Sequence, residues 1–148
     1  MKLEKRVAIR PLEREDSPEI REINSSITNQ ADSSEIEKIL EQEIQNKGED
    51  ACFVAEVEGS VVGFMISRII HAGFGLEKSA WIISFGVKPE FMDQGIGTML
   101  AENVFEKYRQ VGIKQVYTSV LWDSLDILSY FKSLGFERSN FINIRKTL

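Results

Sequence analysis

A strand-like segment that passes through a proline turn into a glycine-rich helix start constrains this fold most strongly. Residues 81–87 are apolar, Pro89 follows, and Gly95 and Gly97 open a helical pattern over residues 98–110. The first N–H groups of a helix have no internal partner and carry the positive end of its dipole. Glycine lets a backbone approach an anion closely. The segment predicts a loop that binds a pyrophosphate-bearing cofactor, with an ordinary strand–turn–helix junction as the alternative.

Two common nucleotide-binding fingerprints do not fit this loop. The dinucleotide fingerprint requires a third glycine where Leu100 stands, and it belongs in the first strand–helix unit of a domain. The nucleotide P-loop requires Gly-Lys-Ser/Thr, and residues 73–79 carry glycines, a lysine and a serine at the wrong spacing. The cofactor therefore belongs to another class.

The length and composition of the chain exclude several classes of partner and site. The chain has 148 residues, which suits one domain over 1–148. A net charge of −5 argues against nucleic acid as a partner. One histidine and one cysteine cannot build a usual zinc site, so we expect no metal. The longest apolar run, 61–67, is too short to cross a membrane, and the charged N-terminus does not resemble a signal peptide. We expect a cytoplasmic protein without membrane partners.

The periodicity predicts a single α+β domain in which helices flank one central mixed sheet. The expected order is βααβββαβαβ. Ser17 is expected to cap the first helix, and residues 58–60 are typical of a hairpin turn. The predicted strands are 7–12, 51–57, 61–70, 81–87, 115–120 and 141–147, and the last helix is expected to start at Asp123 or Ser124 and end at Gly135.

Three motifs in order resemble the GNAT superfamily of N-acyltransferases. Residues 87–100 are similar to the acetyl-CoA loop of that family, with Val-x-Pro-Glu-Phe before Gln-Gly-Ile-Gly-Thr. Residues 120–136 are similar to its later strand and helix, which end in Phe-x-x-x-Gly-Phe. Residues 7–16 are similar to its opening strand. The resemblance spans nearly the whole chain.

The resemblance implies acetyl-CoA as cosubstrate and a gap between strands 81–87 and 115–120, where the thioester enters. It implies that the pantetheine arm pairs with strand 81–87 like an added strand. A backbone N–H near Val87 is expected to hold the thioester carbonyl. The implied cofactor-binding residues are Phe85, Gly86, Val87, Met92, Asp93, Gln94, Gly95, Ile96, Gly97, Thr98, Ser124 and Phe131.

The chain departs from the family pattern where catalytic groups usually stand. Trp81 and Ser119 occupy the two positions that often carry glutamate, and Phe131 replaces the usual tyrosine acid. Ser124 replaces an asparagine, and Met92 replaces a polar or cationic residue at the start of the loop. No standard acid or base is present.

Tyr130, Glu77 and His71 are the catalytic candidates that remain. The alternative to a catalytic role is an ordinary solvated loop position for Glu77 and His71. For Tyr130 the alternative is a place in the hydrophobic core. The amine can also arrive neutral or lose its proton through water. The predicted second helix is acidic and contains Glu35, Glu37, Glu41 and Glu43. If it borders the acceptor site, its charge favours a cationic acceptor. The alternative is that these residues form an ordinary solvated helix face.

Two functions follow from these observations. The first is an acetyl-CoA-dependent N-acetyltransferase that acts on a primary amine of a small molecule or a protein by direct attack on the thioester. The second is a catalytically silent module that binds acyl-CoA. Either function is compatible with a homodimer.

Overall fold

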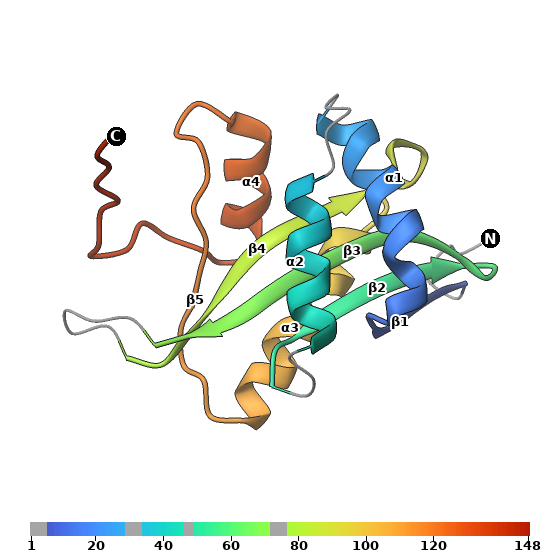
Figure 1. Cartoon of the computed structure of the whole chain (residues 1–148), viewed down its shortest axis with the longest axis horizontal. Helices are drawn as coiled ribbons and strands as arrows, with labels where there is room; N and C mark the ends of the chain where they lie inside the picture. The colour runs from blue at the N-terminus through green and yellow to red at the C-terminus, as the bar shows by residue number, and fades with distance from the viewer. Residues whose placement is uncertain (1–5, 29–33, 46–48, 72–76) are drawn as a thin grey trace. The chain divides into compact units, whose positions relative to one another are not determined.

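The computed structural model describes residues 6–28, 34–45, 49–71 and 77–148. These form two compact units, residues 1–118 and 119–148, which are described separately. The described residues of the first unit form five strands, three α-helices and two short 3-10 helices, and Figure 1 shows how the strands and α-helices are arranged. Its elements are β1 (Val7–Pro11), η2 (Arg14–Asp16), α1 (Ser17–Thr28), α2 (Ser34–Gln45), β2 (Cys52–Val57), β3 (Ser60–Ile70), β4 (Ser79–Val87), η3 (Pro89–Phe91), α3 (Ile96–Gln110) and β5 (Val116–Tyr117).

The strands form one mixed sheet in the order β1-β2-β3-β4-β5. The first four are antiparallel neighbours, and β5 pairs with β4 in parallel. The turn between β2 and β3 has positive φ at Glu58 (52°) and Gly59 (83°), which the twist of a two-residue hairpin requires. The predicted mixed α+β class and this hairpin are confirmed.

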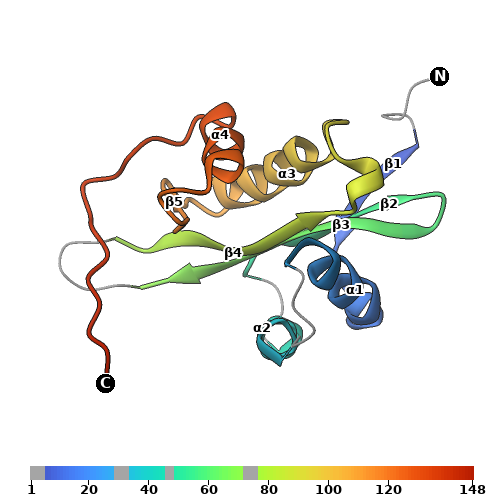
Figure 2. The ribbon, with the colours of Figure 1, turned by 90° about the horizontal axis from the view of Figure 1, so that it is seen from above.

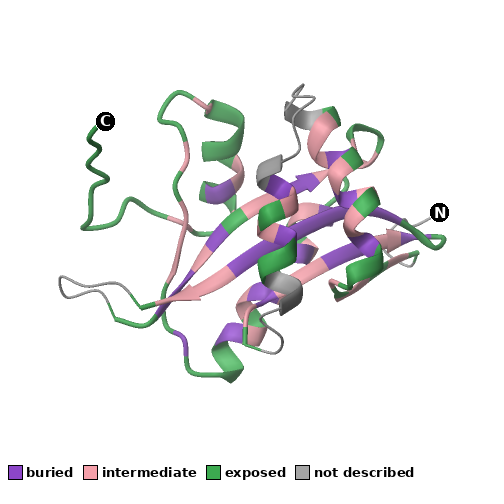
Figure 3. Cartoon of the chain, in the orientation of Figure 1, coloured by how far each residue is buried: buried purple, intermediate pink, exposed green. Residues whose placement is uncertain are grey.

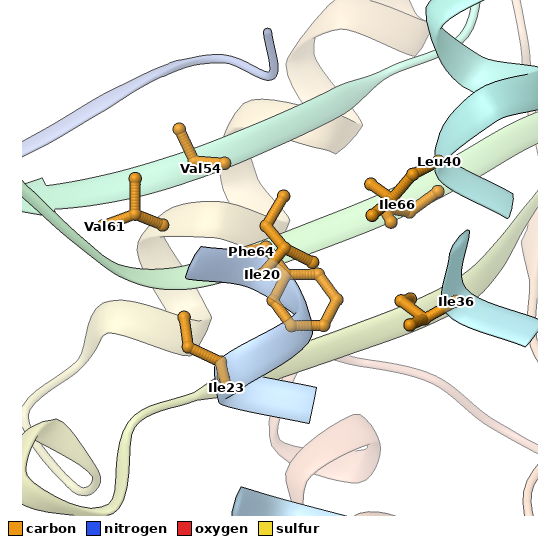
Figure 4. Packing of buried hydrophobic residues seen from close by; sticks show 8 residues of the cluster. All are labelled: Ile20, Ile23, Ile36, Leu40, Val54, Val61, Phe64 and Ile66. Carbon is orange, nitrogen blue, oxygen red and sulfur yellow. The ribbon is translucent and has the colours of Figure 1, made fainter. Parts of the chain in front are cut away.

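Helices α1 and α2 cover one face of the sheet, and α3 covers the other (Figure 2). On the α1/α2 face, apolar stripes of both helices meet β2 and β3, and the buried colour is concentrated there and along the central strands (Figure 3). This burial is what holds two short amphipathic helices in place. The cluster consists of Ile20, Ile23, Ile36, Leu40, Val54, Val61, Phe64 and Ile66 (Figure 4).

The α3 face is closed by tight packing around Gly63. A Cβ atom at Gly63 would lie 3.3 Å from side-chain atoms of Ile96 and Leu100, so any other residue would require these side chains to shift by a few tenths of an ångström. Further along the same face, Tyr108 reaches Ser67 of β3, with 2.6 Å between the two hydroxyl oxygens. The Ala51 N–H donates to the Tyr108 hydroxyl at 3.0 Å, and Ser67 donates to the Ala51 carbonyl. Every hydroxyl in this network has a partner.

The first helix begins at Ser17, the residue predicted to cap it, and other contacts fix its start. Ser17 already has helical dihedrals, so it does not cap α1. Instead the Glu13 N–H donates to the Asp16 carboxylate at 2.7 Å, which fixes η2 ahead of the helix. Arg10 of β1 donates to both Asp16 oxygens, at 2.8 and 2.7 Å. A buried carboxylate that pairs with an arginine on β1 therefore starts the helix.

The second unit holds one helix, α4 (Leu125–Ser133), which ends at a left-handed glycine, Gly135. Ser124 is its N-cap residue but makes no capping hydrogen bond through its side chain. The strand predicted over residues 141–147 is wrong, because residues 141–148 carry no strand. Their alternating apolar pattern is present, but a strand exists only where another strand supplies the ladder. Among the described residues, no helix is long and apolar enough to span a membrane.

Candidate functional site

The parallel ladder between β4 and β5 is very short. Only two residue pairs form it, Ala80 with Val116 and Trp81 with Tyr117. The hydroxyl of Thr118 donates to the Ile82 carbonyl at 3.1 Å, and within the described ranges β5 goes no further. From Ile83 to Val87, β4 therefore has strand partners on the β3 side alone. The ladder ends earlier than the sequence indicated, because β5 spans two residues instead of 115–120.

Backbone N–H groups of β4 point into this open edge. The Lys88 N–H donates to the Val62 carbonyl of β3 at 2.8 Å. Since successive N–H groups of an extended strand point to opposite edges, those of Val87 and Phe85 point away from β3. The β3–β4 register also skips one residue, Ile83, as a β-bulge. The edge of β4 that faces away from β3 thus carries the N–H groups of alternate residues.

The loop that follows β4 bends sharply into α3. After η3, Asp93 and Gly95 both take left-handed dihedrals, with φ of 62° and 84°. Gly95 is the N-cap of α3, and no side chain caps the helix there. The side chain of Gln94 donates to the Glu90 carbonyl at 3.2 Å, which turns it back along the loop. Met92 is 43% exposed and brings no charge.

The first turn of α3 is electrostatically suited to an anion. It contains no acidic residue, so no carboxylate within this turn offsets the positive end of the helix dipole. The side chain of Ile96 is 1% exposed and packs toward β3, so this residue has only its backbone for a ligand. Thr98 is exposed. The predicted loop therefore presents backbone N–H groups more than side chains.

The other predicted cofactor contacts lie in the second unit. Phe131 is 4% exposed and packs edge-on against Phe136 and Tyr130, with ring centroids 5.0 Å apart in each pair. The Ser124 carbonyl accepts the Leu128 N–H at 3.0 Å as part of α4. The hydroxyl of Ser119 accepts a hydrogen bond from the Asn143 amide at 3.1 Å. These contacts order the unit internally.

The three catalytic candidates have different surroundings. Tyr130 is half-buried, and burial raises the pKa of its phenol well above the ordinary value, so the hydroxyl keeps its proton at neutral pH. His71 and Glu77 are exposed at the two borders of a segment, 72–76, that lies outside the described residues. Tyr130 thus has the protonation state of an acid, whereas His71 and Glu77 have the exposure of ordinary surface residues.

The acidic helix is partly neutralised. Glu37 forms an ion pair with Arg21 of α1, and Glu41 is exposed. The side chains of Glu35 and Glu43 lie outside the described residues. In the part of the chain that the structure describes, no group of three or more His, Cys, Asp or Glu side chains is arranged to hold a metal ion.

One feature of this region is invisible in the sequence. Ser79 and Trp81 of β4 each carry a buried polar atom, Oγ and Nε1, that has no hydrogen-bond partner among the described residues. The indole of Trp81 stacks on Tyr117 of β5, with ring centroids 5.1 Å apart. The spacing of two residues between Ser79 and Trp81 indicates that both side chains lie on one face of the strand. The neighbouring sequence does not indicate that both polar atoms lack hydrogen-bond partners.

Comparison with known proteins places this geometry in context. Residues 11–136 match the Acetyltransferase (GNAT) family. An N-alpha-acetyltransferase of Sulfurisphaera tokodaii is 33% identical over 97 residues, which cover 60% of this chain and 58% of that protein. An uncharacterised N-acetyltransferase of Methanocaldococcus jannaschii is 31% identical over 101 residues, which cover 67% of this chain and 44% of that protein. The chain thus spans less than two thirds of either relative.

Solved structures share the fold at low sequence identity. The aminoglycoside N-acetyltransferase AAC(6')-Iy, solved with a bisubstrate analogue of CoA, superposes with a TM-score of 0.80 at 18% identity and covers 96% of this chain and 99% of its own. A possible acetyltransferase from Clostridium difficile 630 gives a TM-score of 0.80 at 16% identity, covering 96% and 97%. At such identities the likeness concerns the fold.

Proposed function

Because the chain belongs to the GNAT acetyltransferase family, we propose that it is an acetyl-CoA-dependent N-acetyltransferase that acts on a primary amine. The observation that carries the proposal is the family match over residues 11–136, which includes both the open edge of β4 and the uncapped start of α3. These two features lie on either side of one short loop. An extended cofactor with an anionic group needs both.

In this proposal the pyrophosphate of acetyl-CoA binds the N–H groups of residues 94–98 at the start of α3. The pantetheine arm then runs along the open edge of β4, where N–H groups such as those of Phe85 and Val87 pair with its amides. Met92, Asp93 and Ile96 contribute backbone. Gly86, Ser124 and Phe131 complete the proposed cofactor contacts.

The proposed reaction is direct attack of a neutral amine on the thioester carbonyl. A new C–N bond forms, negative charge develops on the carbonyl oxygen, and collapse of the tetrahedral intermediate breaks the C–S bond. A β4 N–H near Val87 stabilises that oxygen, an effect worth about 3 kcal/mol in comparable sites. The thiolate leaves with a pKa near that of a free thiol, about 8.5, so it departs without strong acid assistance. The attacking nitrogen loses one proton to water and the thiolate gains one. Tyr130 is the proposed donor of that proton and is reprotonated by the water.

Binding can be tested at Gly97. We expect Gly97→Val to lose most of the affinity for acetyl-CoA by calorimetry, because a branched side chain in the first turn of α3 keeps phosphate away from the N–H groups. Glu106→Val places the same residue on an exposed position of α3 outside the first turn and should bind normally. Normal affinity of a folded Gly97→Val protein would contradict the assignment.

The silent binding module is the second candidate, favoured by Trp81 and Phe131 at positions where the resembled family carries a base and an acid. Both candidates bind CoA, so turnover decides between them. Acetyl-CoA is incubated with a panel of small amines, amino acids and short peptides, and free thiol is measured. Thiol release that depends on an amine supports the enzyme. Tight acetyl-CoA binding without thiol release supports the module.

A further inference from the structure

Three polar side chains share one place on the α1/α2 face of the sheet. Arg68 of β3 is the register partner of Trp81 in β4, so both side chains lie on the same face. That face is the one covered by α1 and α2, because Ile66 and Phe64, which lie two and four residues before Arg68 along β3, belong to the cluster beneath those helices. Ser79 precedes Trp81 by two residues and pairs with Ile70, which puts it on this face as well.

Two of these side chains carry donors for which no described residue supplies an acceptor. Ser79 is 1% exposed, and its Oγ atom has no hydrogen-bond partner within the described ranges. The same holds for the buried Nε1 atom of Trp81. A buried donor without an acceptor costs about 1–3 kcal/mol, so native proteins keep few of them. Two such atoms in neighbouring positions on one strand face point to a ligand that supplies the acceptors.

The cluster lies beside the site proposed for acyl transfer and on the opposite side from the cofactor loop. Trp81 forms the last residue pair of the β4–β5 ladder, and the open edge starts directly after it. The start of α3 packs on the other face, where Ile96 and Leu100 meet Gly63. Trp81 precedes Phe85 by four residues, which is about 13 Å along an extended strand. A ligand of the cluster thus reaches the acyl group from the α1/α2 side.

We propose that Arg68, Ser79 and Trp81 determine acceptor specificity by binding an oxygen-bearing group, a carboxylate or carbonyl, located several bonds from the amine that is acetylated. This inference rests on the proposed function. The indole N–H and the serine hydroxyl donate to the oxygens, and the guanidinium adds charge attraction for a carboxylate. An indole has no basic site, so Trp81 binds the acceptor and does not remove its proton.

A matched pair of amines tests the proposal. ε-Aminocaproate and hexylamine share one carbon chain and differ at the end away from the amine, where one has a carboxylate and the other a methyl group. We expect the native chain to prefer ε-aminocaproate in kcat/KM. Trp81→Phe should reduce this preference about ten- to hundredfold, through KM and not kcat, because one hydrogen bond to a charged group is lost. Ser79→Ala should reduce the preference in the same way. A glycine tripeptide serves as a further acceptor in this assay, because its peptide carbonyls lie nearer the amine than the carboxylate of ε-aminocaproate does.

The other tryptophan of the chain provides the control. Trp122 is 85% exposed, so Trp122→Phe removes an indole N–H that water already satisfies and should leave the preference unchanged. Equal losses for both amines in Trp81→Phe, or an unchanged preference, would overturn the proposal.

A binding measurement keeps the inference separate from the proposed activity. With isotope-labelled tryptophan, the two indole N–H signals are followed by NMR in the full chain with CoA present, and Trp122→Phe assigns them. The Trp81 signal should shift with ε-aminocaproate and stay with hexylamine. If no amine is acetylated but this shift occurs, the acceptor site stands and the activity fails. If the Trp81 signal responds to neither or to both compounds alike, the inference fails.

Discussion

The two faces of the central sheet each bury a serine, and the two serines differ in whether their hydroxyls have hydrogen-bond partners. Ser67 on the α3 face and Ser79 on the α1/α2 face are 0% and 1% exposed. The hydroxyl of Ser67 joins Tyr108 and Ala51 in a closed network, whereas the hydroxyl of Ser79 has no partner among the described residues. The difference separates two uses of a buried polar group. One with all its partners stabilises the fold, and one without them lowers its stability until a ligand supplies them.

The largest expected effect concerns a buried polar group with complete partners. Asp16 is 3% exposed and accepts two hydrogen bonds from Arg10 and one from the Glu13 N–H. Asp16→Ala leaves the Arg10 guanidinium with Glu56 as its ion-pair partner and removes the contact that fixes η2. We expect a loss of about 3 kcal/mol in the free energy of unfolding, measured by urea denaturation. A loss below about 1 kcal/mol would show that the Asp16 carboxylate contributes little to stability although all its hydrogen bonds are formed.

The same carboxylate should make stability depend on pH. Burial alone would raise the pKa of Asp16, but the hydrogen bonds from Arg10 and the Glu13 N–H outweigh it, and the pKa lies below the ordinary value. A lowered folded-state pKa contributes stability that is complete above the unfolded value, about 3.9, and is lost as the pH falls through the folded value. The stability difference between the native chain and Asp16→Asn should therefore be constant near neutral pH and shrink below about pH 4. A difference that does not shrink in acid would contradict this assignment.

Tyr108 tests the closed network directly. Burial raises the pKa of its phenol to about 12, while the hydrogen bonds with Ser67 and Ala51 act in the other direction, so the hydroxyl is protonated in all ordinary buffers. Tyr108→Phe leaves the buried Ala51 N–H without its acceptor. We expect about 2 kcal/mol of destabilisation. The affinity for acetyl-CoA, measured on the folded fraction, should not change.

The smallest effect is the most diagnostic, because it compares one substitution on the two faces. Ser67→Ala should cost about 1–2 kcal/mol, since Tyr108 and the Ala51 carbonyl each lose a partner. Ser79→Ala should leave stability unchanged or raise it, since the desolvation cost of a buried hydroxyl without a partner is removed together with its packing contacts. Thermal unfolding of both variants measures the contrast. Equal destabilisation would mean that Ser79 is bonded in solution, and the comparison between the faces would collapse.

Local chemistry made several parts of the fold predictable. The glycine of the β2–β3 hairpin and the pattern of α3 have causes within a few residues, and both elements lie where the sequence placed them, with α3 starting two residues earlier. The loop with Gly95 and Gly97 was found in the same way. Its role in binding acetyl-CoA stays a prediction, as do the other cofactor contacts.

The wrong predictions concern pairing. Residues 141–147 have the alternation of a strand but form none, and β5 keeps two of its six predicted residues. The start of α1 was located correctly, yet Arg10 and Asp16 stabilise it where a serine cap was expected. Each outcome depends on a partner elsewhere in the chain, and a local pattern carries no information about whether that partner is within reach.

The sequence by itself determined the family, the α+β class and the place of the glycine loop, because motifs and periodicity express short-range constraints. The tertiary structure alone decided where the β4–β5 ladder stops and which buried hydroxyls find partners. Ser67 and Ser79 are the same residue type in similar apolar strands. Only the packing of α3 against β3 brings the Tyr108 hydroxyl to one of them, whereas no described residue forms a hydrogen bond with the hydroxyl of the other.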